Sequence, residues 1–89
     1  LPANKILQDR RSSKTVTLTE KEALILRKLF QTWPEDVTKE SLLMEVWGFQ
    51  PDISTHTLET HIYRIRQKLL IISENPIIQT TQRGYLLKK

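Results

Sequence analysis

Residues 57–69 read TLETHIYRIRQKL, and the apolar members of this stretch recur at the spacing of an α-helix. The spacing i, i+4, i+7 and i+11 places four of them on one face: Leu58, Ile62, Ile65 and Leu69. We therefore expect a helix over residues 54–70 that buries this stripe in the core of the fold.

The opposite face of this helix carries polar side chains that suit the edges of DNA bases. It displays His56, Glu59, Thr60, Tyr63, Arg64 and Gln67, with Arg66 and Lys68 beside them. The major groove of B-DNA admits one α-helix and presents hydrogen-bond donors and acceptors. We expect Arg64 to contact guanine, Glu59 to accept from a cytosine amine and Thr60 to touch a thymine methyl group. The alternative is an ordinary solvated face with Arg–Glu pairs.

Two shorter helices are predicted upstream. Residues 19–32 open with a capping box, Thr19 with Glu22, and close before Pro34 because proline disfavours helix at the preceding residue. Residues 39–47 follow the cap residue Thr38 and end at Gly48. The expected apolar faces are Ala23, Leu26, Leu29 and Phe30 in the first helix, and Leu42, Leu43, Val46 and Trp47 in the second. Trp33 and Trp47 are expected in the core, with a phosphate contact as the alternative for Trp47.

Strand-like runs flank the helices. Residues 5–18 contain two short runs around a polar turn, which predicts a small antiparallel hairpin. Residues 77–88 contain two more, joined by Gln82-Arg83-Gly84, so a second hairpin carries Arg83 at its tip. Such a tip can enter a minor groove or lie along phosphates; the alternative is an ordinary charged hairpin turn. The order predicts a single α+β domain over 1–89, a winged helix-turn-helix.

Composition excludes several other classes of protein. The 89 residues contain no cysteine and two glycines, so disulfide scaffolds, thiolate metal sites and Gly-rich phosphate loops are excluded. No apolar run is long enough for a membrane span, and the start lacks both a signal-like core and an initiator Met, so we expect a fragment of a longer chain.

The net charge of +4 is placed unevenly along the chain. Residues 1–55 contain eight Lys or Arg and eight Asp or Glu, whereas residues 56–89 contain six against two. A local basic excess indicates a polyanionic partner. His56 and His61 lie about 140° apart around a helix, so they cannot bind a metal ion from one face. No acid–base pair suggests catalysis, so we expect neither an enzyme nor a cofactor.

Several linked motifs resemble the C-terminal effector domain of OmpR/PhoB-type response regulators. The recognition helix of that family reads approximately T-V-x-x-H-I-x-x-L-R-x-K-L, to which residues 57–69 are similar. Leu18-Thr19 with Glu22 resembles its L-T-x-x-E opening, and residues 42–48 resemble its L-L-x-x-V-W-G. Residues 80–85 are similar to its wing motif T-V-R-G-x-G-Y, with one residue and one glycine fewer.

The resemblance implies a non-enzymatic winged helix that binds tandem DNA half-sites as a pair, although it is a monomer alone. It implies an N-terminal phosphorylatable receiver domain, a bacterial cytoplasmic two-component system, and contact with RNA polymerase through the loop from Gly48 to Ser54. By position, the base contacts would be Glu59, Thr60, Tyr63 and Arg64. The DNA backbone contacts would be Trp47, His56, His61, Arg66, Gln67 and Lys68, and the wing contacts would be Thr81, Gln82 and Arg83. The rival hypothesis is a winged-helix module that docks on an acidic protein partner.

Overall fold

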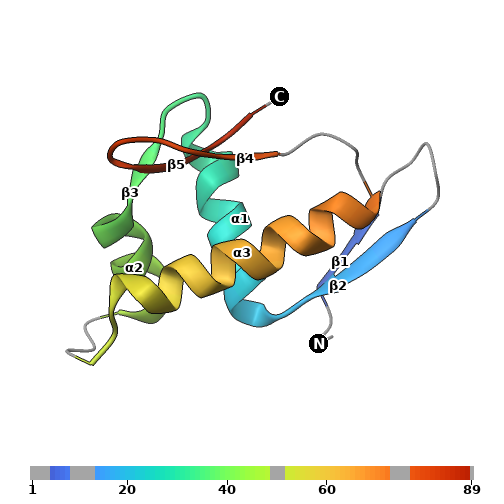
Figure 1. Cartoon of the computed structure of the whole chain (residues 1–89), viewed down its shortest axis with the longest axis horizontal. Helices are drawn as coiled ribbons and strands as arrows, with labels where there is room; N and C mark the ends of the chain where they lie inside the picture. Colours follow the sequence, from blue (N-terminus) through green and yellow to red (C-terminus); the bar gives the residue numbers. More distant parts are fainter. Residues whose placement is uncertain (1–4, 9–13, 49–51, 73–76, 89) are drawn as a thin grey trace.

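Three helices pack around one core, and the longest crosses the whole molecule (Figure 1). They are α1 (Glu20–Thr32), α2 (Lys39–Trp47) and α3 (Thr55–Ile72). The structure is a computed structural model, and it describes residues 5–8, 14–48, 52–72 and 77–88. No helix among these residues combines the length and the apolar character that a membrane crossing needs.

The stripe predicted on α3 forms the centre of the core. Leu58 and Ile65 have no exposed surface, Ile62 and Leu69 have almost none, and Ile72 extends the stripe beyond the predicted end at residue 70. The helix is therefore buried along one side for its full length. Core partners come from every other element whose side chains are described: Val16, Leu18, Ile25, Leu29, Val37, Leu42, Val46, Ile78, Tyr85 and Leu87.

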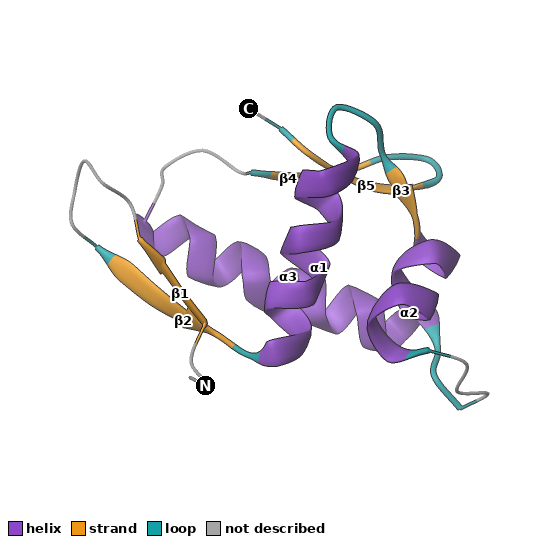
Figure 2. Cartoon of the chain, turned by 180° about the vertical axis from the view of Figure 1, so that it is seen from behind, coloured by secondary structure: helices purple, strands orange, loops and turns teal. Residues whose placement is uncertain are grey.

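Two small sheets lie at different sides of the helices (Figure 2). One sheet is the predicted N-terminal hairpin, in which β1 (Lys5–Gln8) pairs antiparallel with β2 (Thr15–Leu18). The other has the strand order β3-β5-β4 and consists of β3 (Val37–Thr38), β4 (Ile78–Thr80) and β5 (Gly84–Leu87). The strand β3 was not predicted. It ties the C-terminal hairpin to the chain directly before α2.

Local signals fix the ends of α1 and α2 as the sequence predicted. The Thr19 hydroxyl accepts from the Glu22 amide at 3.2 Å, and the Glu22 carboxylate accepts from the Thr19 amide at 2.9 Å, which completes the capping box. Thr38 caps α2 by accepting from the Ser41 amide at 3.1 Å. Gly48 ends α2 with φ of 73°, a conformation that side chains rarely adopt.

Three details of the prediction were wrong. Phe30, which was expected on the buried face of α1, is 69 % exposed, and Ile25 is buried in that helix instead. Trp33 is 42 % exposed and lies outside the core, whereas Trp47 packs against the core as expected. Gly84 belongs to strand β5, so the turn of the C-terminal hairpin is formed by residues 81–83. Helical periodicity alone cannot say which of two neighbouring apolar stripes is covered.

Candidate nucleic-acid interface

The outer face of α3 is an exposed polar surface between two anchored edges. Tyr63 is 63 % exposed, and Arg64, Gln67 and His56 are exposed with it. The Thr60 hydroxyl donates to the His56 carbonyl at 3.0 Å within the helix, so its methyl group and lone pairs remain for other contacts. At about 100° per residue, these positions lie opposite the buried stripe. Their exposure makes the centre of this face available to a partner.

One edge of α3 is joined to the C-terminal sheet. Glu59 forms an ion pair with Lys39 at 3.2 Å, from the first residue of α2. The Arg66 guanidinium donates to the Ile78 carbonyl at 3.1 and 3.3 Å, and to the Thr80 hydroxyl at 2.7 Å. Glu59 and Arg66 are seven residues apart and so lie on the same side of the helix. This edge therefore fixes how the hairpin β4–β5 sits beside α3.

The opposite edge of α3 is joined to α1 and α2. His61 Nδ1 lies 2.8 Å from the Thr57 carbonyl oxygen, and its ring meets Trp47 edge-on with 5.0 Å between ring centres. The Lys68 ammonium donates to the Glu22 carboxylate at 2.6 Å. Both side chains were predicted as DNA backbone contacts, and both have partners inside the protein. The packing of α3 against α1 thus depends on a predicted binding residue.

Glu22 is the buried carboxylate of the described residues, at 1 % exposure. Burial by itself raises the pKa of Glu22, but the Lys68 hydrogen bond and charge and the Thr19 hydrogen bonds outweigh it and hold the pKa below its usual value. The carboxylate is therefore charged at neutral pH and joins three parts of the fold: the cap of α1, the body of α1 and the side of α3.

The turn of the β4–β5 hairpin is fastened by Asp36. The Thr81 hydroxyl donates to one carboxylate oxygen at 2.8 Å, and the Arg83 guanidinium lies 3.5 Å from the other. Within the turn, the Gly84 amide donates to the Thr81 hydroxyl at 2.9 Å, and the Thr81 amide donates to the Gly84 carbonyl at 2.8 Å. The Arg83 side chain remains 67 % exposed. Gln82 is also exposed at this tip.

The structure thus gathers most of the predicted residues around α3 and the adjoining turn. Lys39 and Asp36 also belong to this surface and were missed. Their contacts join positions 20 or more residues apart, and no local sequence pattern reports such pairs. The predicted polymerase loop from Gly48 to Ser54 is only partly visible, since residues 49–51 lie outside the described residues. No group of three metal-binding side chains converges in the described ranges.

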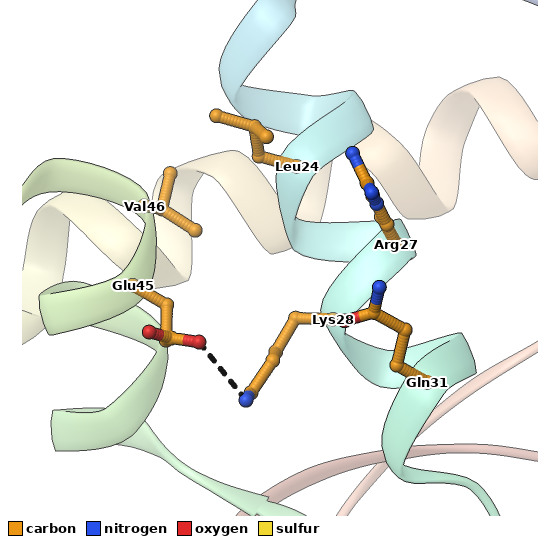
Figure 3. Close-up of a pocket in the computed structure, with 6 residues that line it drawn as sticks. All are labelled: Leu24, Arg27, Lys28, Gln31, Glu45 and Val46. Atoms are coloured by element: carbon orange, nitrogen blue, oxygen red, sulfur yellow. Dashed lines mark ion pairs between the residues drawn. The ribbon is translucent and has the colours of Figure 1, made fainter.

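A second surface feature lies away from α3, between α1 and α2 (Figure 3). It is an open groove of about 200 Å³ lined by Leu24, Arg27, Lys28, Gln31, Glu45 and Val46. Lys28 and Glu45 form an ion pair across it at 3.0 Å. The Lys28–Glu45 pair spans this groove, so the outer face of α3 remains the stronger candidate site.

Residues 13–87 match the family described as "Transcriptional regulatory protein, C terminal". The chain belongs to this family. Membership confirms the resemblance to OmpR/PhoB-type effector domains and makes the chain part of a transcription regulator, as the sequence predicted. The family consists of regulators rather than enzymes.

The chain is also similar to individual proteins that are named as transcription regulators. The chain is 34 % identical over 83 residues to the probable transcriptional regulator ycf27 of Porphyra purpurea, covering 89 % of the chain and 34 % of that protein. It is 32 % identical over 75 residues to the heme response regulator HssR of Staphylococcus aureus (strain JH9), covering 83 % and 34 %. The chain therefore spans about a third of the length of these relatives.

A solved structure confirms the fold of this family member. The C-terminal domain of the nisin resistance regulator NsrR, a lantibiotic response regulator, is similar with a TM-score of 0.71 and 35 % identity. The match covers 85 % of this chain and 78 % of that one. The α+β winged helix-turn-helix predicted from the order of elements is therefore the fold of this regulatory domain.

Proposed function

We propose that this domain binds double-stranded DNA in a sequence-specific manner, with α3 in the major groove and the turn of β4–β5 against the neighbouring backbone. The observation that carries the proposal is the exposed centre of α3, where Tyr63, Arg64 and Gln67 project. Both edges of this face are fixed by contacts with the rest of the protein. A helix anchored on both sides presents its outer residues in a fixed orientation, which base recognition requires.

The roles of individual residues follow from their partners. Arg64 is exposed and has no polar partner among the described residues, so its two-pronged guanidinium suits a guanine edge. Thr60, Tyr63 and Glu59 complete the proposed base-reading set. His56, Gln67, Thr81, Gln82 and Arg83 are the proposed phosphate contacts, the last three from the turn; the exposure of Arg83 supports this. Arg66, Lys68, His61 and Trp47 support phosphate contacts chiefly by holding α3 in place.

For the full-length protein we propose a bacterial, cytoplasmic two-component response regulator without catalytic activity in this domain. Its N-terminal receiver domain would control pairing on tandem half-sites, and the loop from Gly48 to Ser54 would contact RNA polymerase. The support is family membership together with the response regulators among the relatives, of which this chain covers about a third.

The test is selection of bound sequences from a random duplex pool across a salt series. Enrichment of a short repeated motif, with affinity that falls steeply as salt rises, would support the proposal. Salt-sensitive retention without an enriched motif would reduce it to nonspecific DNA binding. Absence of retention at low salt would overturn it and favour a module that docks on an acidic protein.

A further inference from the structure

Lys39 makes three contacts that join the proposed reading helix to the hairpin beside it. Its ammonium lies 3.2 Å from the Glu59 carboxylate of α3. The same ammonium lies 5.9 Å from the centre of the Tyr85 ring, which is buried in β5. Its backbone amide donates to the Arg83 carbonyl of the hairpin turn at 3.3 Å. Neither the sequence motifs nor the family resemblance gave this residue a role.

The backbone of Lys39 is fixed from both directions along the chain. It is the first residue of α2, directly after Thr38, which is both the cap of that helix and a residue of β3. Thr38 in turn pairs with Gly84 of β5. The Lys39 side chain therefore extends from a fixed backbone position. The aromatic face of Tyr85 further limits where its ammonium can lie.

The charge and orientation of the Glu59 carboxylate near DNA would depend on the Lys39 ammonium. Its side chain is 47 % exposed, and Lys39 is its polar partner among the described residues. A carboxylate brought against DNA meets the negative charge of the phosphates, which repels it. A fixed ammonium offsets that repulsion, and it holds one carboxylate oxygen while the other remains able to accept a hydrogen bond from a base.

We infer that Lys39 is a specificity-determining positioning residue, which acts by holding Glu59 in the orientation that reads a base with an exposed amine, such as cytosine. The inference rests on the proposed DNA-binding function and extends it to a residue outside the reading helix. Exposed ion pairs contribute little to folding stability, so the pair acts on base preference rather than on the fold.

The experiment compares bound-sequence profiles of the wild-type chain with those of Lys39→Met, Lys39→Arg and Glu59→Gln. Lys39→Met should lower discrimination about 10-fold at one base position, and Glu59→Gln should lose discrimination at that same position. The double variant should lose no more than either single variant. Lys39→Arg should retain the preference because arginine also pairs with a carboxylate. Thermal unfolding should be close to wild type in each case.

Lys28→Met provides a matched control in the groove between α1 and α2 (Figure 3). Lys28 pairs with Glu45 at 3.0 Å, and the exposures of the two pairs are similar: 29 % and 51 % here, 32 % and 47 % for Lys39 and Glu59. The control should leave the profile unchanged. An unchanged profile in Lys39→Met, or a change at another position, would overturn the inference alone. A wild-type chain that enriches no motif would overturn the proposed function and the inference together.

Discussion

The partners of a side chain on α3 depend on its angle around the helix more than on its residue type. Arg64 and Arg66 are two residues apart, yet Arg64 is exposed at the outer face while Arg66 is fastened to Ile78 and Thr80 of β4. Lys68 lies on the other edge and pairs with the buried Glu22. The basic residues of this helix therefore divide into one that is exposed for the proposed reading of DNA and two that hold the fold.

Arg64→Ala tests the first of these roles. Loss of a two-pronged base contact should cost about 1–3 kcal/mol of discrimination at one base pair. The fold should be unaffected because Arg64 makes no polar contact with the described part of the protein. Binding to a series of duplexes, each changed at one position, measures this. Equal loss on every duplex would show that Arg64 contacts only the backbone.

Lys68→Met tests the second role. It should lower the free energy of unfolding by about 2–3 kcal/mol, because a buried carboxylate loses a charged hydrogen-bond partner. Lys28→Met, which breaks a more exposed ion pair of similar length, should cost less than about 1 kcal/mol. Urea denaturation of both variants gives the comparison. If the two variants lost similar free energies of unfolding, the burial of Glu22 would not make its ion pair with Lys68 more stabilising than an exposed pair.

Glu22 should also make the fold sensitive to acid. Its pKa is lower in the folded chain than in the unfolded chain, so its contribution to stability is complete above the usual pKa of a glutamate. That contribution is lost as pH falls through the lowered folded value. Glu22→Gln should therefore show a weaker decline in the free energy of unfolding across that acidic range. Parallel pH profiles for the two proteins would contradict this assignment.

Among the elements, the two-residue strand β3 connects the C-terminal hairpin to α2. It pairs with β5 through Val37–Tyr85 and Thr38–Gly84, and it runs directly into α2. The hairpin is thus tied to α2 by strand pairing and to α3 by Arg66. β3 and Arg66 together therefore set where the hairpin lies beside the proposed reading helix.

Gly84→Ala should break this link. A methyl group at that position would collide with the Val37 carbonyl oxygen and lie 2.9 Å from the Thr38 Cα, both of which are backbone atoms that cannot move aside. We expect a loss of about 3 kcal/mol, at the upper end for overpacking. Amide hydrogen exchange should show faster exchange at the β3–β5 pairs. Retained protection there would show that the sheet can absorb the added group.

How much the sequence predicts differs between elements. The stripe of α3, the cap residues Thr19 and Thr38 and the stop at Gly48 are local signals, and the structure confirms them. Strand β3 is too short to show an alternating pattern, so it was missed. The partners of Lys68 and Arg66 were missed for another reason. Contacts across 46 and 12 residues depend on how the elements pack, which a single sequence does not reveal.

For the molecule as a whole, binding to DNA depends less on the net charge of +4 than on which basic side chains are exposed rather than ion-paired within the protein. Some cations are neutralised within the protein, such as Lys28 by Glu45 and Lys68 by Glu22. Arg64 on α3 is exposed, and Arg83 at the turn is 67 % exposed although it pairs with Asp36 at 3.5 Å. The basic surface proposed to meet DNA is therefore smaller than the composition suggests.

Arg83→Ala tests the outlying part of that surface. Affinity should fall by a similar factor for all duplexes, since a phosphate contact does not distinguish bases. The slope of log affinity against log salt should decrease by about 1. The Arg83 side of the ion pair with Asp36 is 67 % exposed and the pair is 3.5 Å long, so the pair should not offset this effect. A change confined to particular sequences would instead assign Arg83 to reading the minor groove.

The way the hairpin turn is held has a consequence for protein engineering. Register is fixed on both sides of residues 81–83, by Thr80 opposite Tyr85 and by Gly84 against Thr38. Because turn length also sets hairpin register, a graft should keep three residues here and keep Thr81, whose hydroxyl bonds Asp36 and the Gly84 amide. The side chains at Gln82 and Arg83 are then the positions to vary. If the turn meets the DNA backbone as proposed, such changes would alter the affinity of chimaeric regulators for DNA while α3 and its base preference stay the same.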